Sequence, residues 1–409
     1  MSVRSVIGKN FGDEGKGLAT DYFASLAQNA GQNCLVIRHN GGAQSGHTVV
    51  RKTPDKKRFV FHELSSGSCR GADTLWIDSF YPDIYKLGEE IRNFREAFGF
   101  CPDIYSMDTV CMTTPDDVLL NMALESSRGS SRHGSCGMGI NECDLRTKAG
   151  FGLKLGQVCS MDADALYHAM LHIRREYTAK RLQMMADTLD TEANEYVQLL
   201  SNNNVLENAA YDMVSNMKYV KLLTEADLRK KLQCTDTLIF EAGQGLLLDR
   251  NNAFYAPHVT ASDTGLTNPC RFLSHLGLKL DEVIYVSRSY VTRHGAGPLP
   301  NECPKTVLGD LWEDVTNETN AWQGTLRYAQ HEDEEAFVSE IQKDIANNNA
   351  NGCRVSLFLT HLNETNGCVM MKDETVHFEE FMKRPFISDT FDGVYLSASE
   401  CSEDTIAVV

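Results

Sequence analysis

Short runs of apolar residues recur along the chain, and between them lie longer segments whose apolar residues repeat at helical spacing. Helical patterns cover 84–98, 162 to about 200, and 207–232. Strands that alternate with helices are typical of an α/β protein built around a large, mostly parallel central sheet flanked by helices. The runs of strand length are 3–7, 34–38, 74–77, 237–240, 283–287 and 355–359.

The polar-rich helical region from about 160 to 232 predicts a helical insertion on one side of this sheet. Asparagine-rich patches at 202–204 and 347–351 indicate loops. We see no internal repeat and no break in composition that would mark a linker. We therefore expect a single domain over residues 1–409, with a core of substantial size.

The charge of the chain narrows the choice of partners. Its 39 basic and 56 acidic residues give a net charge of −17, which disfavours nucleic acid or an anionic membrane surface as the main partner. No apolar run reaches the ~18 residues of a membrane span, and we expect no signal peptide, because the N-terminal residues read directly as a strand. The thirteen cysteines are scattered and form no C-x-x-C pair, which favours reduced thiols in a cytoplasmic protein.

The first strand leads into a glycine-rich loop, Gly12-Asp13-Glu14-Gly15-Lys16-Gly17, and a helical pattern follows from Leu18 to about Ala27. Backbone N–H groups and the helix dipole both favour an anion at such a turn, so we expect a P-loop-like nucleotide-binding fold. The loop departs from the Walker pattern, whose first glycine would fall at Asn10 and whose hydroxyl residue would fall at Gly17. Asp13 has no electrostatic reason to be in a loop that only holds phosphate.

Three further segments carry chemistry at the ends of expected strands. In 36–49, His47 stands between Gly46 and Thr48, where it could donate to an oxyanion or simply support a tight turn. In 238–249 the amide of Gln244 is suited to reading a base edge, and the hydroxyls of Thr260 and Ser262 follow. The fourth segment is 290–302, which contains Thr-Arg-His-Gly-Ala-Gly-Pro.

Taken together and in order, these segments resemble the adenylosuccinate synthetase family. Six sequence patterns of the family have counterparts in this chain, in the same order. They are G-D-E-G-K-G at 12–17, G-G-x-N-A-G-H-T at 41–48, H-L-x-P-S-G at 62–67, G-T-T-x-x-G-I-G-P at 129–139, E-G-A-Q-G-x-x-L-D at 241–249 and T-R-V-G-x-G-P-x-P-T-E at 292–302. The family's carboxyl-terminal S-x-G-P-x-R-x-x-T-I is echoed at 397–406. Six collinear motifs are highly specific for the superfamily to which this family belongs.

The resemblance implies an enzyme that joins IMP and L-aspartate, using GTP and Mg²⁺, through a 6-phosphoryl intermediate. Asp13 matches the base that removes the purine N1 proton, His47 the donor to the transferring phosphoryl group, and Lys16 a phosphate partner. The family's Mg²⁺ ligands correspond to the Asp13 carboxylate and the Gly46 carbonyl. A homodimer is also implied.

The same resemblance assigns binding residues. Those implied for the nucleoside triphosphate are Gly12, Glu14, Gly15, Gly17, Gly46, Thr48, His361, Asn363 and Ser399. Those implied for the purine monophosphate are Gln44, Ser131, Gln244 and Thr260, and those for the amine donor are Gln323 and Arg327.

Two departures from the family leave substrates open. The aspartate loop G-x-T-T-G-R-x-R-R corresponds to 320–328, where only Arg327 matches a family arginine, so aspartate as the amine donor is open. Asn363 and His361 replace the aspartate and lysine that flank guanine, so either GTP or ATP could serve. The arginine that reaches in from a partner subunit has no clean match, and Arg146 or Lys148 could replace it.

Three functions therefore remain. The first is an IMP–aspartate ligase. The second is the same chemistry on another purine nucleotide such as dGMP, or with ATP, as in phage enzymes that make succino-2-aminodeoxyadenylate; Asp13 disfavours dGMP because it would crowd a 2-amino group. The third is a non-catalytic nucleotide-binding paralogue, which the joint presence of Asp13, Lys16 and His47 disfavours.

Overall fold

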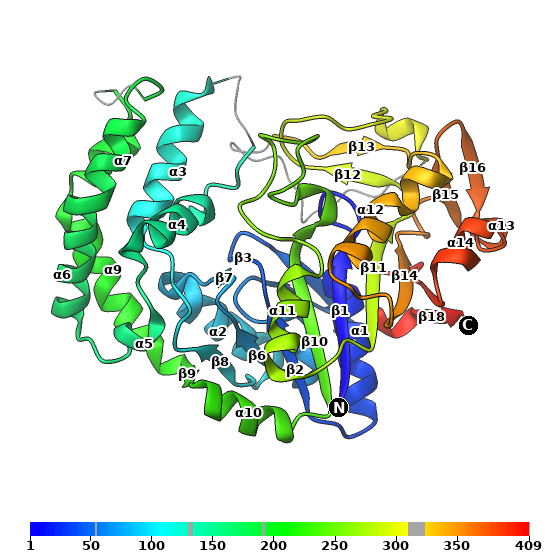
Figure 1. Cartoon of the computed structure of the whole chain (residues 1–409), viewed down its shortest axis with the longest axis horizontal. Helices are drawn as coiled ribbons and strands as arrows, with labels where there is room; N and C mark the ends of the chain where they lie inside the picture. Colours follow the sequence, from blue (N-terminus) through cyan, green and yellow to red (C-terminus); the bar gives the residue numbers. More distant parts are fainter. Residues whose placement is uncertain (54, 130–133, 190–192, 310–323, 409) are drawn as a thin grey trace.

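A ten-stranded sheet runs through the computed structural model, which describes residues 1–53, 55–129, 134–189, 193–309 and 324–408. Its order is β18-β17-β14-β11-β1-β10-β2-β6-β8-β9, and every neighbouring pair is parallel except β17 with β18 (Figure 1). The strands are β1 (Ser2–Gly8), β2 (Cys34–Arg38), β6 (Asp73–Trp76), β8 (Ile104–Met107), β9 (Val220–Leu223), β10 (Thr237–Gly245), β11 (Glu282–Arg288), β14 (Arg354–Thr360), β17 (Gly393–Leu396) and β18 (Ile406–Val408). The expected α/β fold around a mostly parallel sheet is confirmed.

The six strands predicted from the sequence are β1, β2, β6, β10, β11 and β14, and they stand side by side in the sheet. Both faces of this central part are covered. Val6, Val36 and Ile239 pack under α1 (Lys16–Asn29), whereas Val3 and Leu238 pack with α10 (Glu225–Gln233) and α11 (Thr267–Leu276) on the other face. Burial on both faces explains why these strands are apolar at successive positions.

Helices gather at one end of the sheet and form a lobe beyond β8 and β9 (Figure 1). The predicted helix 84–98 is confirmed as α2, which packs with α6 and α9 around one apolar cluster. The helices at this end are α2 (Ile84–Phe98), α3 (Pro115–Ser127), α4 (Ile140–Arg146), α5 (Leu155–Val158), α6 (Ala163–Ile173), α7 (Ala179–Met184), α8 (Glu195–Leu200) and α9 (Asn203–Asn216).

The continuous helix predicted over 207–232 is wrong in its middle. Helix α9 ends at Asn216, and the chain then forms β9, which pairs in parallel with β8 before α10 begins. Four residues of strand between two helices leave a weak signal in the sequence, and pairing with β8 decides their conformation. Helices α6 and α7 join through a π-helical turn, Arg174–Thr178.

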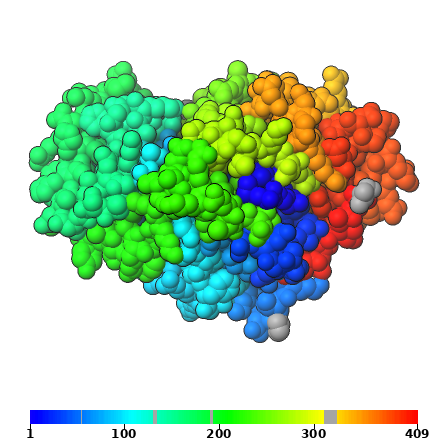
Figure 2. Space-filling view, turned by 60° about the horizontal axis from the view of Figure 1, so that its bottom comes forward, coloured from blue at the N-terminus to red at the C-terminus, as the bar shows by residue number. Residues whose placement is uncertain are grey.

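The opposite end of the molecule is built from carboxyl-terminal elements, as the red segments of Figure 2 show. Phe337 of α12 and Phe381 of α13 fill the core there with residues of β11 and β14. These helices are α12 (Glu334–Asn347), α13 (Phe378–Phe381) and α14 (Pro385–Thr390). The small two-stranded pairs are β3 (Gly41–Gly42) with β7 (Phe80–Tyr81), β4 (His47–Arg51) with β5 (Lys57–Phe61), β12 (Val291–Arg293) with β13 (Arg327–Ala329), and β15 (Cys368–Met371) with β16 (Glu374–His377).

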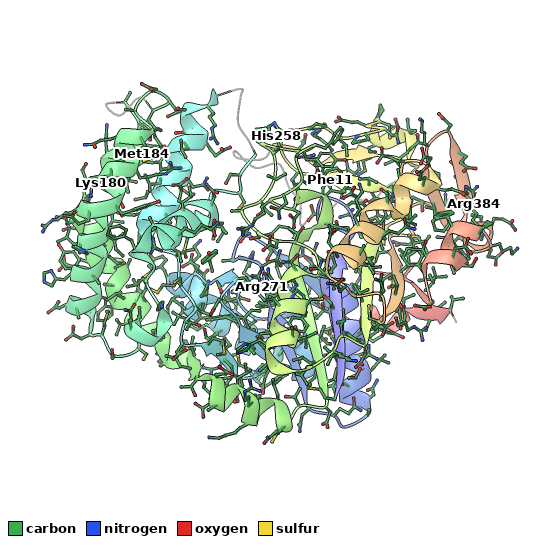
Figure 3. The ribbon with its side chains drawn as sticks, in the orientation of Figure 1. Phe11, Lys180, Met184, His258, Arg271 and Arg384 are labelled. Carbon is green, nitrogen blue, oxygen red and sulfur yellow. The ribbon has the colours of Figure 1, made fainter. Side chains whose placement is uncertain are left out.

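Phe11 and His258 lie between the helical lobe and the carboxyl-terminal end (Figure 3). Lys180 and Met184 lie far out on the lobe, and Arg384 lies at the opposite end of the molecule. Within the described ranges, none of the helices combines the length and the apolar character that crossing a membrane requires.

Candidate active site

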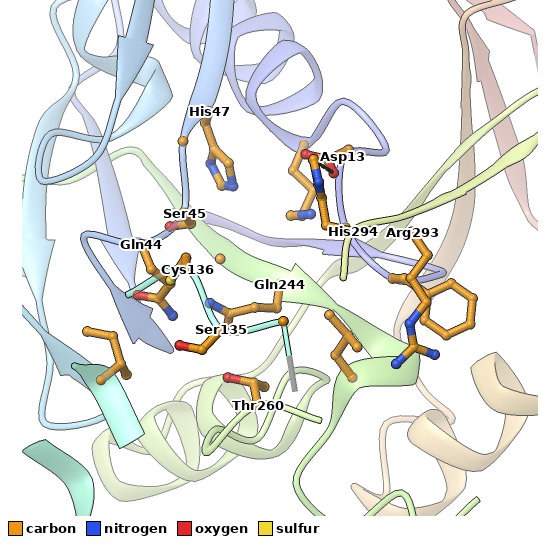
Figure 4. A pocket seen from close by; sticks show the side chains of 18 of the residues that line it. Asp13, Gln44, Ser45, His47, Ser135, Cys136, Gln244, Thr260, Arg293 and His294 are labelled. Carbon is orange, nitrogen blue, oxygen red and sulfur yellow. Dashed lines mark ion pairs between the residues drawn. The ribbon is translucent and has the colours of Figure 1, made fainter. Parts of the chain in front are cut away.

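The carboxyl ends of the central strands open onto a cavity of about 1010 Å³. Ligands of parallel α/β sheets bind at this edge, because the loops that leave neighbouring strands meet there. The cavity is lined from the loops after β1, β2, β11 and β14 and from the end of β10. Figure 4 shows His47, Gln244 and Asp13 directed toward the same space from three of these elements.

Most of the residues predicted for the site line this cavity. They are Gly12, Asp13, Gly15, Lys16, Gly17, Gln44, Gly46, His47, Thr48, Gln244, Thr260, His361, Asn363 and Ser399. Glu14 and Arg327 are not among the lining residues. Ser131 and Gln323 lie outside the described residues.

The first loop turns its two acidic residues in opposite directions. Asp13 has a positive φ of 59° and lines the cavity with a partly exposed carboxylate. Glu14 turns inward: its Oε1 accepts from the backbone N–H groups of Asn10 and Gly12, and its Oε2 lies 2.7 Å from Lys16 Nζ. The carboxylate predicted to bind nucleotide therefore holds the loop in shape and partly neutralises Lys16.

Helix α1 begins directly after this turn. Its N-cap residue Gly15 has a φ of 95°, and a Cβ there would lie 3.1 Å from Thr360 Cγ2 of β14. A side chain at this position would therefore be strained both by its backbone conformation and by its neighbour. The glycine lets the amino end of α1 face the cavity, where its N–H groups and dipole favour a phosphate.

His47 is oriented by a buried carboxylate that the sequence analysis did not assign. Its Nδ1 lies 2.7 Å from Glu241 Oε1, while Glu241 Oε2 accepts from Ser66 N at 3.1 Å and lies 3.9 Å from Arg38 Nη1. The Ser66 hydroxyl also donates to Glu241. Among the described residues, His47 Nε2 has no hydrogen-bond partner, and it faces the cavity.

The surroundings of Glu241 and His47 shift the pKa of both groups. Burial alone would raise the pKa of Glu241, but His47, Arg38 and the Ser66 hydroxyl lower it to about 2, so this carboxylate is ionised. Burial lowers the pKa of His47, and the charge of Glu241 opposes that shift. The ionised Glu241 therefore fixes the hydrogen of a neutral His47 on Nδ1 and stabilises any proton that Nε2 takes up.

Asn40 sets the orientation of Gln244. Its Nδ2 donates to Gln244 Oε1 at 2.9 Å, and its Oδ1 accepts from Gly243 N at 2.8 Å. The network therefore assigns Gln244 Nε2 to the cavity, where it has no partner among the described residues. This position presents only a donor, which suits a ring nitrogen or a carbonyl oxygen of a purine. Gln44 Oε1 is also buried, and it has no hydrogen-bond partner among the residues that the structure describes.

The far end of the cavity is tied to the first loop. Thr360 Oγ1 donates to the Glu14 carbonyl at 2.7 Å and lies 2.7 Å from Nδ1 of His361, whose φ is 60°. Asn363 lines the cavity two residues further on. The Ser399 hydroxyl donates to Asp404 at 3.0 Å and accepts from Cys401 N.

His294 enters the cavity from the segment after β12. Its Nε2 lies 3.2 Å from Asp13 Oδ2, and Figure 4 shows the two side chains together. The sequence analysis passed over this histidine, although it stands where the quoted family pattern T-R-V-G has valine. A polar residue in place of an apolar one within a matched motif was the available signal.

Two predicted arginines are held in structural ion pairs. Arg327 Nε donates to Glu302 at 2.8 Å, and Arg327 Nη1 donates to the carbonyls of Gly295 and Gly297, so the structure does not bring this guanidinium into the cavity. Arg146 is fully buried and contacts Asp117 in bidentate fashion. The expectation that Arg146 could reach a partner subunit is therefore wrong.

The residues present fit a Mg²⁺ ion that arrives with phosphates. The described residues contain no group of three or more His, Cys, Asp or Glu side chains that could hold a metal. Asp13 and Gly46 nevertheless line one cavity and offer carboxylate and carbonyl oxygens, the hard ligands that Mg²⁺ prefers. Mg²⁺ is usually held by one or two carboxylates together with substrate phosphates, so this donor set is sufficient.

Comparisons with known proteins show which proteins the chain is similar to. The chain is 28% identical over 335 residues to adenylosuccinate synthetase of Halothermothrix orenii, covering 80% of this chain and 71% of that protein. It is 27% identical over 416 residues to the Tolumonas auensis enzyme of the same name, covering 98% and 88%.

Two solved structures share the fold. A fully ligated adenylosuccinate synthetase from Plasmodium falciparum superposes with a TM-score of 0.67 at 17% identity, over 100% of both chains. Succinoaminodeoxyadenylate synthetase of cyanophage S-2L, bound to dGMP and dATP, gives 0.62 at 14% identity, over 99% of this chain and 95% of that one. The sequence model described as adenylosuccinate synthetase matches residues 5–331, and the chain therefore belongs to the adenylosuccinate synthetase family.

Proposed function

We propose that this protein is a purine nucleotide ligase that forms a C–N bond at purine C6, converting IMP, L-aspartate and a nucleoside triphosphate to adenylosuccinate, nucleoside diphosphate and phosphate. One observation carries the proposal: Asp13, Lys16 and His47 face one cavity from two loops, and Glu241 orients the histidine. A protein that only bound nucleotides would need neither the base nor the oriented histidine, which disfavours the non-catalytic alternative.

The first half-reaction transfers a phosphoryl group. Asp13 takes the N1 proton of the purine, which makes the 6-oxygen a nucleophile. The 6-oxygen forms a bond to the γ-phosphorus, and the bond between that phosphorus and the β,γ-bridging oxygen breaks to release the diphosphate. Gln244 Nε2 is placed to donate to an acceptor on the purine ring.

His47 acts next to the transferring group. Phosphate charges beside Nε2 and the ionised Glu241 beside Nδ1 both favour the imidazolium. In that state Nε2 donates to the oxygen that carries developing negative charge. In the second half-reaction the amine nitrogen attacks C6, one amine proton is lost, and the C6–O bond breaks. His47 then donates to the leaving phosphate.

Asp13 and Gly46 would hold the metal ion. When bound, Mg²⁺ neutralises charge on the phosphates of the triphosphate. Lys16 contributes in the same direction, because an ammonium has three hydrogens and Glu14 accepts only one of them.

For the co-substrates we propose a nucleoside triphosphate, without choosing between ATP and GTP, and L-aspartate as the amine donor. Asn363 offers both a donor and an acceptor to the base of the triphosphate, which is compatible with ATP as well as GTP. L-aspartate is proposed from family membership alone, because Gln323 lies outside the described residues and Arg327 pairs with Glu302. A homodimer and a cytoplasmic location are proposed on the same basis.

The test is a substrate matrix on the purified protein. IMP, GMP and dGMP are each combined with ATP or GTP and Mg²⁺, with and without L-aspartate, and the succino product is detected by mass. Asp13→Asn and His47→Asn are each expected to lower turnover at least about a hundredfold. Asp212→Asn on α9 and His168→Asn on α6 are matched controls, since both residues are exposed and distant from the cavity lining. Turnover that survives both site variants would contradict the mechanism.

A further inference from the structure

A second cavity, of about 340 Å³, lies beside the glycine-rich loop that follows β1. Lys9 and Asn10 line it from the start of that loop, and α12 supplies a further wall. Phe11 is the only residue that lines both this cavity and the large one described above. Among the described residues, none of those assigned above to a substrate or to Mg²⁺ lines the second cavity, so it needs an explanation of its own.

Lys9 places a buried ammonium in the wall of this cavity. Its side chain is only 7% exposed, and burial lowers its pKa to about 8 although nearby carboxylates raise it, so the group is mostly protonated at neutral pH. Its Nζ donates to Asn10 Oδ1 at 3.1 Å and lies 3.9 Å from the centre of the Phe337 ring, and the described residues provide no ion pair for it. An ammonium has three hydrogens, so one remains for an acceptor in the cavity.

Aromatic side chains form much of the remaining surface. Phe11 and Tyr255 are buried and meet edge to face, with ring centres 5.0 Å apart. Phe254 packs against Tyr255 with ring centres 4.8 Å apart, yet it is 69% exposed and therefore stands at the mouth of the cavity. An exposed aromatic ring beside buried ones offers an apolar surface to a ligand with a ring of its own.

The charged side chains around the cavity cancel one another. Glu332 is exposed and has no ion-pair partner in the described part of the chain, whereas Glu340 pairs with Lys343 at 2.6 Å. Burial lowers the pKa of His331 to about 3, so this residue is neutral. Together with Lys9, the lining thus carries two positive and two negative groups. It suits a ligand without net charge that brings an acceptor to Lys9 and a cationic donor to Glu332.

We propose that this cavity binds an α-amino acid with an aromatic side chain. The carboxylate of the ligand accepts from Lys9 Nζ, its ammonium faces Glu332, and its ring lies against the aromatic walls. The volume is at the lower end of the range for small-molecule sites, which suits a ligand of this size. The proposal is independent of the ligase activity proposed above, because none of the charged groups that it uses lines the large cavity.

Calorimetric titration of the purified protein with L-phenylalanine, in the absence of nucleotides, tests the site. We expect saturable binding with a dissociation constant of about 1 mM or lower. Three related compounds each lack one group of the ligand: phenylpropionate has no ammonium, phenethylamine has no carboxylate, and L-alanine has no ring. Each should bind about tenfold more weakly or worse. L-aspartate, which has no ring and a second carboxylate, should not compete with L-phenylalanine.

Variants locate the binding. Glu332→Gln and Phe254→Ala change exposed side chains, and each should weaken the binding of L-phenylalanine about tenfold. Glu332→Gln should leave the binding of phenylpropionate unchanged, because that compound has no ammonium. Lys9→Met removes the buried ammonium and should weaken binding at least about tenfold in a protein whose circular dichroism is unchanged. Glu335→Gln and Tyr211→Ala are matched controls, since both residues are exposed and neither lines the cavity.

Each contrary result has a definite meaning. The absence of saturable binding up to about 10 mM L-phenylalanine overturns the proposal. Phenylpropionate that binds as tightly as L-phenylalanine, or an unchanged affinity in both Glu332→Gln and Phe254→Ala, also overturns it. Affinity that is lost in Gln244→Leu but kept in the variants of the second cavity places the ligand in the large cavity instead. A protein that binds L-phenylalanine as expected but forms no succino product supports this proposal and contradicts only the ligase activity.

Discussion

Replacing Glu241 by glutamine should remove the negative charge beside His47 and leave the shape of the side chain nearly unchanged. The two side chains have nearly the same volume, so contacts around the end of β10 are preserved. The lost charge is the one that faces His47 Nδ1 at 2.7 Å and Arg38 Nη1 at 3.9 Å. Glu241 is fully buried, so water cannot replace these interactions.

The size of the effect follows from the pKa of Glu241, which the fold lowers from 4.5 to about 2. A lowered pKa stabilises the folded state above the unfolded value, and that stabilisation is lost as the pH falls through the folded value. The difference corresponds to roughly 3 kcal/mol near neutral pH and about 1 kcal/mol near pH 3. The stability gap between the parent protein and Glu241→Gln should narrow accordingly on acidification.

Catalysis should suffer more than binding. Without the carboxylate, the imidazolium of His47 loses its counter-charge, and kcat is expected to fall by about a hundredfold or more while KM for the monophosphate changes little. Urea unfolding at neutral and acid pH gives the stabilities, and steady-state assays give kcat and KM.

Asp117→Asn is the matched control: it removes a buried charge paired with Arg146 outside the cavity, and should destabilise the fold without lowering kcat. A kcat within about threefold of the parent, or an equal stability gap at both pH values, would refute this account.

Three further changes have defined outcomes. Gln244→Leu removes the only donor at its position and should raise the dissociation constant of the purine monophosphate about tenfold by calorimetry; an unchanged constant would place the base elsewhere. Arg146→Met leaves the Asp117 carboxylate buried without its counter-charge and should cost about 3–5 kcal/mol in denaturant unfolding, whereas a phosphate-binding role would instead appear in KM. Chelation of Mg²⁺ should abolish triphosphate consumption, and Asp13→Asn should raise the Mg²⁺ concentration that restores residual activity; an unchanged requirement would remove Asp13 from the metal site.

The central sheet was predictable because its strands obey one rule. Strands buried on both faces must be apolar at successive positions, and β2, β10 and β11 show this in the sequence. Strand β9 was not predictable, because Val220–Leu223 lies between two helices at the edge of the sheet and only its pairing with β8 defines it.

The candidate site was predictable as a set of loops but not as a set of side-chain directions. Asp13 and Glu14 are adjacent acids in one motif, and nothing in their order says that one lines the cavity and the other accepts from Asn10 and Gly12. Arg327 matched a family arginine, yet its guanidinium donates a hydrogen bond to Glu302, which lies 25 positions earlier in the sequence. Partners that are distant in sequence decide such cases, and a single sequence does not pair them.

The inward turn of Glu14 has a consequence for how the site holds phosphate. Lys16 and Glu14 lie 2.7 Å apart with both side chains about 2% exposed, so the lysine brings little net charge to the cavity before ligand binds. We therefore expect attraction for phosphate to come mainly from the amino end of α1, whose first-turn N–H groups have no carbonyl partner within the helix, and from the arginines that line the cavity. Because Glu14 also accepts from Gly12 N, a phosphate that draws Lys16 outward pulls on the same loop that carries Asp13. If the proposed roles hold, we expect binding of the triphosphate and placement of Asp13 to be linked through Glu14.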